Sequence, residues 1–261
     1  MAVVVDSTGN AVQYEALGNA GKPGLLLIHG TGATAMSNWG AMAGSFSDQR
    51  RVLLPNYSGS GETRDNGGRL TLASLAAQML AVAETESAGP VDVVGFSLGA
   101  EVAATLAALH PGQVRRLILI AGWSSSADPR LALGIQLWTH LYESDLSAFR
   151  TLSTLLGFSP AFLQQIGPAG IALLSRWIPS SGVLRQLALD LEIDLRPLLP
   201  NITAPTLVIG CTQDQLVPVQ NARALHEAIP HSEYQEFDTG HMLILEDAPG
   251  LTQAIRDFLF K

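Results

Sequence analysis

Residues 91–109 constrain the fold of this chain more than any other segment. The β-branched run Val91-Asp92-Val93-Val94 predicts a buried strand, and the alanine- and leucine-rich segment that begins at residue 98 predicts a helix. Between them stands Gly95-Phe96-Ser97-Leu98-Gly99, a Gly-x-Ser-x-Gly motif in the strand–turn–helix context that a nucleophilic serine requires. We therefore expect the Ser97 hydroxyl to project from a sharp turn at the carboxyl end of a strand.

One steric and one electrostatic argument explain which residues surround Ser97. Side chains two positions before and after a serine on so tight a turn would collide, so Gly95 and Gly99 remove them. The amide of Leu98 falls in the first turn of the helix, where N–H groups are free and the helix dipole favours negative charge. Leu98 is therefore an expected backbone donor to an oxyanion.

Length and composition exclude several classes of protein. The chain has 261 residues, of which 47% are hydrophobic and 15% charged, as expected for one domain with a large core. Its net charge of −8 argues against nucleic acid as a partner, and no apolar run is long enough for membrane insertion. Cys211 is the only cysteine, so no intrachain disulfide is expected. The N-terminus lacks the pattern of a signal peptide, and we expect a cytoplasmic protein.

Short apolar strands alternate with helices along much of the chain. This pattern predicts an α/β fold in which a mostly parallel central sheet has helices on both faces. The first two strands are expected to form an edge hairpin, and later strands are expected at residues 25–28, 51–55, 114–121, 206–209 and 232–237. Besides the helix after Ser97, helices are expected at residues 36–46 (capped by Ser37 or Asn38), 70–86, 219–228 and 249–260.

The alternation of strands and helices stops after Gly122. Residues 123–200 contain no convincing strand, and prolines divide them into helical segments at about 130–143, 145–156, 160–166, 169–177 and 181–191. We predict a core domain formed by residues 1–122 and 201–261, with residues 123–200 inserted as a helical cap or lid. The cap is rich in large apolar residues, and the side chains expected to line a substrate pocket are Trp123, Trp138, Trp177 and Met242. For each of them plain core packing is the alternative.

A second backbone donor is expected near His29-Gly30-Thr31-Gly32, which follows the strand at residues 25–28. Oxyanion stabilisation needs an N–H besides that of Leu98, and the loop after a neighbouring strand commonly supplies it. The glycines would let this backbone turn inward. We predict the Thr31 amide as this donor, with Gly32 as second choice.

A serine hydroxyl is a weak nucleophile until a base removes its proton, and histidine is suited to that role near neutral pH. Among six histidines, only His241 lies in a glycine-containing loop between the last strand and the closing helix, so we predict that it is the base. Asp214, in the loop after the preceding strand, is the predicted carboxylate that orients it. The competing carboxylates are Asp238, Glu101, Asp190 and Asp194.

Together these motifs resemble the capped α/β-hydrolases of the serine esterase, lactonase and carbon–carbon hydrolase group. His29-Gly30, the serine motif, the Asp214 loop and Gly240-His241 match in order and spacing over essentially the whole chain. Haloalkane dehalogenases and epoxide hydrolases resemble this fold but carry aspartate at the nucleophile position. Two departures are Ala100, where many relatives have glycine, and a 30–32 loop without the proline found in many carbon–carbon hydrolases.

Three functions follow from this pattern. The leading hypothesis is hydrolysis of an ester, thioester or lactone of a mostly apolar small molecule through an acyl-enzyme on Ser97. The second uses the same residues for carbon–carbon bond hydrolysis of a vinylogous diketone, or for biosynthetic acyl transfer or cyclisation. The third is a ligand-binding protein with little turnover. The sequence has neither a metal-ligand cluster nor a Gly-x-Gly-x-x-Gly stretch, so we expect no metal and no cofactor, and it leaves homo-oligomerisation open.

Overall fold

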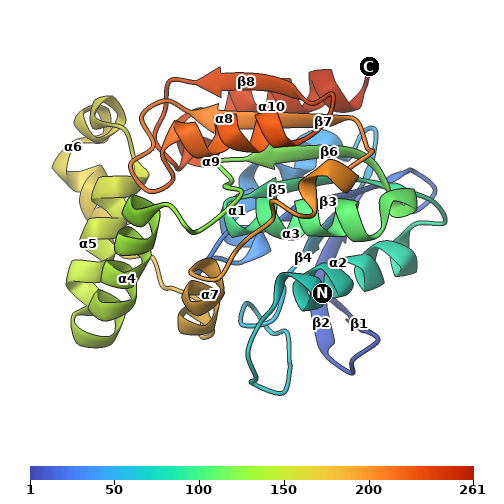
Figure 1. The fold of residues 1–261 in the computed structure, drawn as a ribbon, viewed down its shortest axis with the longest axis horizontal. Helices are drawn as coiled ribbons and strands as arrows, with labels where there is room; N and C mark the ends of the chain where they lie inside the picture. Colours follow the sequence, from blue (N-terminus) through green and yellow to red (C-terminus); the bar gives the residue numbers. More distant parts are fainter.

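An eight-stranded sheet runs through the protein (Figure 1), whose computed structural model describes residues 1–261. Its strands are β1 (Ala2–Val5), β2 (Ala11–Leu17), β3 (Gly24–Ile28), β4 (Arg51–Pro55), β5 (Val91–Phe96), β6 (Val114–Ile120), β7 (Thr206–Cys211) and β8 (Glu233–Phe237). Their spatial order is β1-β2-β4-β3-β5-β6-β7-β8. The β1–β2 and β2–β4 pairs are antiparallel and all others are parallel, which confirms the predicted fold class and the edge hairpin.

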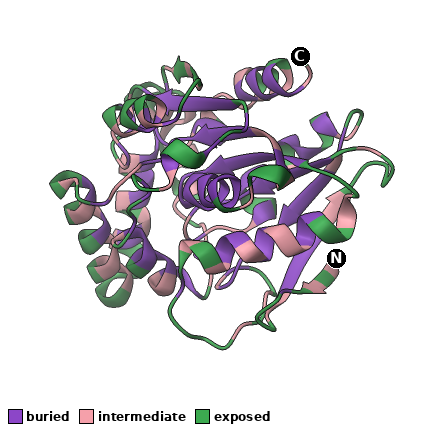
Figure 2. Ribbon diagram, turned by 45° about the vertical axis from the view of Figure 1, so that its right-hand side comes forward, coloured by how far each residue is buried: buried purple, intermediate pink, exposed green.

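Helices cover both faces of this sheet. Two hydrophobic cores lie between the sheet and these helices. The first core contains side chains of α2 (Leu72–Glu86), α3 (Leu98–Leu109) and α8 (Val219–Ala228), whereas the second core contains those of α1 (Ala35–Ala43), α9 (Leu243–Glu246) and α10 (Ala248–Leu259). In β3, Leu26 and Ile28 belong to the first core and Leu25 and Leu27 to the second. Because successive strand residues point to opposite faces, a strand covered on both sides must be apolar throughout. Figure 2 shows the central strands and α3 as buried.

Between β6 and β7 the chain leaves the sheet and forms four helices, which are called the helical insertion below. They are α4 (Pro129–Ser144), α5 (Leu146–Gly157), α6 (Pro160–Leu174) and α7 (Val183–Asp190). Figure 1 shows α4, α5 and α6 grouped at one end of the sheet, with α7 nearer the strands. A backbone bridge between Ser125 and Asp194 ties the two ends of the insertion together. Three short 3-10 helices connect helices to the strands that follow them: η1 (Gly44–Phe46) after α1, η2 (Pro111–Gln113) after α3 and η3 (Leu199–Asn201) after α7.

The two helical segments expected at 160–166 and 169–177 are both present within α6, where the non-helical backbone of Gly167 (φ 62) before Pro168 separates them, and the second ends at Leu174. The predicted cap of α1 is wrong. The cap of α1 is Thr34 and neither Ser37 nor Asn38. The Thr34 hydroxyl accepts a hydrogen bond from the Ser37 N–H (3.1 Å) while the Ser37 hydroxyl accepts one from the Thr34 N–H (2.9 Å), which makes a capping box.

None of the helices combines the length and the hydrophobicity that a bilayer-spanning segment needs.

Candidate active site

Ser97 occupies the turn between β5 and α3. Its backbone has φ 53 and ψ −130, a conformation that is rare for a residue with a side chain. The Ser97 N–H donates to the Ile120 carbonyl (2.9 Å) and fixes the turn against the end of β6. A Cβ atom on Gly99 would lie 2.4 Å from the Ile28 carbonyl oxygen, so only glycine lets α3 start this close to β3. The serine hydroxyl consequently stands at the carboxyl edge of the sheet.

Two side chains from later loops meet Ser97 at this edge. His241 Nε2 lies 3.1 Å from Ser97 Oγ, and His241 Nδ1 lies 2.7 Å from Asp214 Oδ2. The other carboxylate oxygen of Asp214 accepts hydrogen bonds from the N–H groups of Leu216 (2.8 Å) and Val217 (2.7 Å). All three side chains are buried. A carboxylate held in this way accepts the Nδ1 proton and leaves Nε2 unprotonated toward the serine.

The competing carboxylates lie elsewhere. Asp238 is exposed and accepts hydrogen bonds from side chains of the neighbouring 212–213 loop. Asp194 pairs with Arg196 on the surface of the protein. Glu101 is buried behind the serine turn and accepts a hydrogen bond from the Trp123 N–H (2.7 Å). None of these carboxylates contacts the histidine.

The 29–32 loop packs against Ser97. A Cβ atom on Gly30 would lie 3.1 Å from Ser97 Cβ, so the loop backbone is in contact with the Ser97 turn. The Gly30 N–H donates to Asn38 Oδ1 (2.9 Å) and therefore already has an acceptor. Asn38, expected as a helix cap, holds this loop instead.

The N–H groups of Thr31 and Gly32 differ in whether they already have a hydrogen-bond acceptor within the protein. The Gly32 N–H, the second choice, donates to Gln186 Oε1 (2.7 Å) and therefore already has an acceptor. The Thr31 N–H makes no hydrogen bond within the protein. The Leu98 N–H is the first of α3, and no carbonyl within the helix can accept it. Thr31 and Leu98 thus keep free amides beside the serine.

A cavity of about 590 Å³ lies over Ser97 and His241 and is walled by both the sheet-side loops and the helical insertion. Trp123, Trp138, Trp177 and Met242 all line it. Phe149, behind them, packs against Trp138 and Trp177 with ring centroids 5.6 Å and 5.7 Å apart, which restrains both indoles. A partly open, largely apolar chamber with a few polar groups suits a small, mostly apolar ligand.

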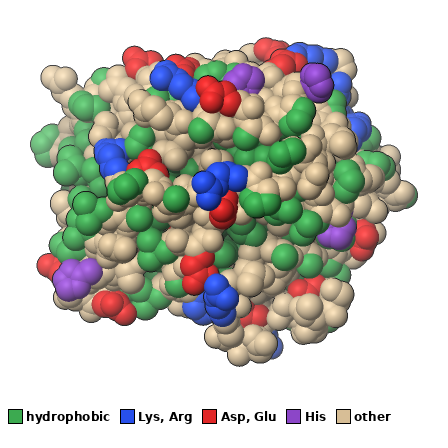
Figure 3. All heavy atoms as spheres, viewed as in Figure 1, with side chains coloured by type: hydrophobic (Ala, Val, Ile, Leu, Met, Phe, Trp, Pro, Cys, Tyr) green, Lys and Arg blue, Asp and Glu red, His purple; other side chains and the backbone are tan.

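The outer surface of the insertion is also apolar. Figure 3 shows hydrophobic side chains gathered at the end of the molecule where α4–α6 lie, and Leu133, Leu137, Leu155 and Leu173 are exposed there. Leu133 and Leu137 also line the cavity, so the apolar surface continues from the exterior into the chamber.

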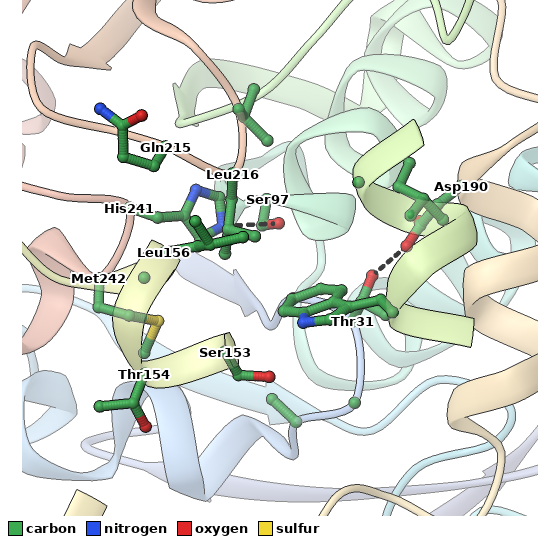
Figure 4. A pocket seen from close by; sticks show the side chains of 18 of the residues that line it. Thr31, Ser97, Ser153, Thr154, Leu156, Asp190, Gln215, Leu216, His241 and Met242 are labelled. Carbon is green, nitrogen blue, oxygen red and sulfur yellow. Dashed lines mark hydrogen bonds between the residues drawn. The ribbon is translucent and has the colours of Figure 1, made fainter. Parts of the chain in front are cut away.

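Asp190 is the buried carboxylate of the cavity wall. Its Oδ2 accepts a hydrogen bond from the Thr31 hydroxyl (2.8 Å), and Figure 4 shows the two side chains pointing toward each other. Burial raises the pKa of Asp190 to about 7, against the opposing effect of the hydrogen bond from Thr31. Burial also lowers the pKa of His29 to about 4, so this histidine, stacked on Tyr57, is neutral at neutral pH.

Sequence reasoning did not assign Gln186 to the site and treated Asp190 only as a rival carboxylate. Both are buried on α7 and are spaced four residues apart, so they share one face of that helix. Two polar residues on the buried face of an amphipathic helix are the signal that could have identified them. No group of three or more His, Cys, Asp or Glu side chains is gathered so as to hold a metal ion.

Comparison with known proteins shows the family. A sequence profile described as the alpha/beta hydrolase fold matches residues 23–248. Pyrrolizixenacetamide deacetylase of Xenorhabdus hominickii is 39% identical over 241 residues, which cover 91% of both chains. The 2-hydroxy-6-oxo-2,4-heptadienoate hydrolase of Pseudomonas putida is 27% identical over 263 residues, covering 92% of this chain and 90% of that one. The crystal structure of an enol-lactonase from Burkholderia xenovorans has the same fold, with a TM-score of 0.84 over 100% of both chains at 22% identity. The chain therefore belongs to the α/β-hydrolase fold family and is a hydrolase.

Proposed function

We propose that this hydrolase is a serine enzyme that cleaves an ester, thioester or lactone bond in a small, mostly apolar molecule. The observation that carries the proposal is the hydrogen-bonded chain from Ser97 through His241 to Asp214 beside two free amides. A nucleophile, a base within hydrogen-bond reach of it and a group that orients the base are the elements of acyl transfer.

In the first half of the proposed reaction, Ser97 Oγ attacks the carbonyl carbon of the substrate while His241 Nε2 takes the hydroxyl proton. The carbonyl oxygen becomes an oxyanion and accepts hydrogen bonds from the Leu98 and Thr31 N–H groups. The tetrahedral intermediate collapses, the alcohol or thiol leaves with the proton from His241, and an acyl-serine remains. Asp214 stabilises the imidazolium without taking its proton.

In the second half, His241 removes a proton from water, and the resulting hydroxide attacks the acyl carbon. The same two amides hold the second oxyanion. The carboxylic acid leaves, and the proton on His241 returns to Ser97 Oγ. Because the site is buried, the amides act in a surrounding of low polarity, where removal of one such donor typically costs about 10²–10³ in rate.

The helical insertion would act as the lid of this reaction. Residues of α4 and α5 line the cavity together with Trp177, so the substrate would lie between the insertion and the carboxyl edge of the sheet. A lid of this composition favours apolar acyl groups and excludes water from the oxyanion.

A second candidate function is hydrolysis of an N-acetyl amide. It is favoured by the 39% identical relative, which is named as a deacetylase of an acetamide. The same residues suffice, but the step that breaks the bond differs. An amine leaves only after protonation, so His241 must deliver its proton to the amide nitrogen as the carbon–nitrogen bond breaks.

The test uses two matched probes, p-nitrophenyl acetate and p-nitroacetanilide, which differ only in the atom that leaves. A series of p-nitrophenyl esters from C2 to C12 reports the preferred acyl length. The proposal expects turnover of esters by the native protein and none by Ser97→Ala. Turnover of the anilide at a comparable rate would move the assignment to amides. If Ser97→Ala retains turnover, Ser97 is not the nucleophile. If Ser97→Ala instead tautomerises a vinylogous diketone, the result supports carbon–carbon bond hydrolysis as the function.

A further inference from the structure

Helix α7 contacts the 29–32 loop through two side chains on one face. Gln186 Oε1 accepts the Gly32 N–H (2.7 Å), and Asp190 Oδ2 accepts the Thr31 hydroxyl (2.8 Å). Asp190 is four positions after Gln186, about one turn of helix, and the two loop residues that they hold are consecutive. The helix therefore holds the two groups that follow the free Thr31 N–H along the chain, while Asn38 of α1 holds the Gly30 N–H that precedes it.

The helix that makes these contacts is itself fixed to the core. Gly182, its N-cap, packs so closely on Gly59 that a Cβ atom at position 182 would lie 2.3 Å from the Gly59 Cα. The Gly182 N–H donates to the Gly59 carbonyl (2.9 Å), and Gln186 Nε2 donates to Ser60 Oγ (2.9 Å). Just before α7, the Ser180 N–H donates to the Gly32 carbonyl (2.8 Å). These contacts hold α7 in one position relative to the loop.

We propose that Gln186 and Asp190 are positioning residues that aim the Thr31 amide at the oxyanion, so that α7 of the insertion completes the oxyanion hole. This inference rests on the serine-hydrolase function proposed above. Neither side chain touches the reacting atoms. They act through the backbone of Gly32 and the side chain of Thr31.

The physical reason lies in the two glycines of the loop. Gly30 and Gly32 flank Thr31, and Gly32 has φ +71, so the backbone on either side of the donor lacks the restraint of a Cβ atom. An oxyanion donor works only when it is fixed before the charge develops. The hydrogen bonds that the loop donates to Asn38, Gln186 and Asp190 supply the restraint that the loop sequence lacks.

The experiment compares Gln186→Met, Asp190→Leu and Thr31→Val with the native enzyme. The last variant breaks the Thr31–Asp190 contact from the loop side and keeps the backbone amide. For p-nitrophenyl acetate we expect kcat to fall roughly tenfold to a hundredfold, because a misplacement near 1 Å costs about that much, while KM changes by less than about threefold. Asp190→Asn keeps an acceptor for the Thr31 hydroxyl and should restore most of the rate.

A second readout isolates the oxyanion. A trifluoromethyl ketone adds to Ser97 Oγ and places a negative oxygen where the ester oxyanion would be, whereas the methyl ketone of the same chain length binds without this addition. The α7 variants should weaken the trifluoromethyl ketone by about the same factor as kcat and leave the methyl ketone within about threefold. Combining Thr31→Val with Asp190→Leu should cost no more than either change alone, because both break one contact.

Arg185→Gln is the matched control. Arg185 lies on the same helix and pairs with Asp65 (2.6 Å), and its Nε donates to the Gly68 carbonyl (2.9 Å). It joins α7 to the surface loop at residues 65–68 and makes no hydrogen bond to the 29–32 loop, so its loss should leave kcat and the ketone affinity unchanged.

The outcomes separate the two proposals. If Ser97→Ala is inactive but the α7 variants keep native kcat and ketone affinity and lose only thermal stability, the two residues are structural and the inference is overturned. Equal losses in Arg185→Gln would overturn it as well. If Ser97→Ala is as active as the native enzyme, the serine mechanism itself fails. Should Gln186→Met not fold, Thr31→Val and Asp190→Asn still decide the question, because they alter only one hydrogen bond.

Discussion

A Cβ atom on Gly95 would lie 2.1 Å from the carbonyl oxygen of Gly99, so the end of β5 and the first turn of α3 touch backbone to backbone. Real Cβ atoms do not approach an oxygen this closely, and the neighbour is main chain that cannot rotate away. The strained φ of Ser97 is held between these two glycines. The Gly-x-Ser-x-Gly motif is therefore a packing requirement as much as a chemical one.

Replacing Gly95 with alanine should consequently destabilise the protein by about 3 kcal/mol or more, because β5 and α3 must separate to admit the methyl group. Urea unfolding followed by circular dichroism measures this loss. Gly112→Ala is the control, since a Cβ atom there meets nothing within 4 Å, and it should change the free energy of unfolding by less than about 0.5 kcal/mol. Equal effects at the two positions would contradict the steric argument.

A second prediction concerns Asp214. In Asp214→Asn the side chain can still accept the Leu216 and Val217 N–H groups, but it can turn its NH₂ toward His241 and select the wrong tautomer. We expect kcat for p-nitrophenyl acetate to fall about 10³–10⁴-fold with little change in stability. Asp238→Asn removes the other carboxylate of this region, which contacts only the 212–213 loop, and should keep nearly native activity. The proposed role fails if the two variants lose activity equally.

Much of the fold follows from local sequence. The pattern at 219–228 predicts α8 with its observed bounds, because Val219, Ala222 and Leu225 recur at helical spacing and bury one face. The apolar runs of β3 and β5 predict strands covered on both faces. Since the carboxyl ends of parallel strands share one edge, the loops after β5, β7 and β8 were expected to meet there, and Ser97, Asp214 and His241 lie within hydrogen-bond distance.

Other features depend on contacts between distant parts of the chain. Gln186 is 154 residues from Gly32, and Asp190 is 159 residues from Thr31, so no local pattern indicates that α7 holds the 29–32 loop. The choice between the Thr31 and Gly32 amides depends on the same contact. The cap of α1 was misassigned because Thr34, Ser37 and Asn38 are all good cap residues. Only the position of Gly30 shows that Asn38 is occupied elsewhere.

The raised pKa of Asp190 predicts a pH dependence of stability. Burial raises the pKa from 3.8 to about 7, so the folded protein holds this proton more tightly than the unfolded chain does. The stability that this group contributes is therefore complete below pH 4, falls as the pH rises toward 7 and is constant above that. The difference between the two pKa values corresponds to roughly 4 kcal/mol.

Asp190→Asn removes this titration and keeps an acceptor for the Thr31 hydroxyl. The free energy of unfolding of the native protein relative to the variant should fall between pH 4.5 and pH 8. Burial also raises the pKa of Glu101, and the charge of Asp190 adds to that rise, so the comparison reports the titration of Asp190 together with its coupling to Glu101. A difference that stays constant over this range would show that Asp190 is ionised throughout, as an ordinary carboxylate is.

The last prediction concerns the depth of the cavity. Trp177 lines the chamber and is held by Phe149, so Trp177→Ala should open space that longer acyl chains can occupy. Each methylene newly buried is worth about 0.8 kcal/mol, or roughly fourfold in kcat/KM, so the optimum in a C2 to C12 series of p-nitrophenyl esters should move to longer chains. Leu173→Ala is the control, because Leu173 is exposed on the same insertion and does not line the cavity. If both variants keep the native chain-length profile, the acyl group binds away from Trp177. If both shift it alike, the insertion acts through its overall stability and Trp177 does not set the acyl length.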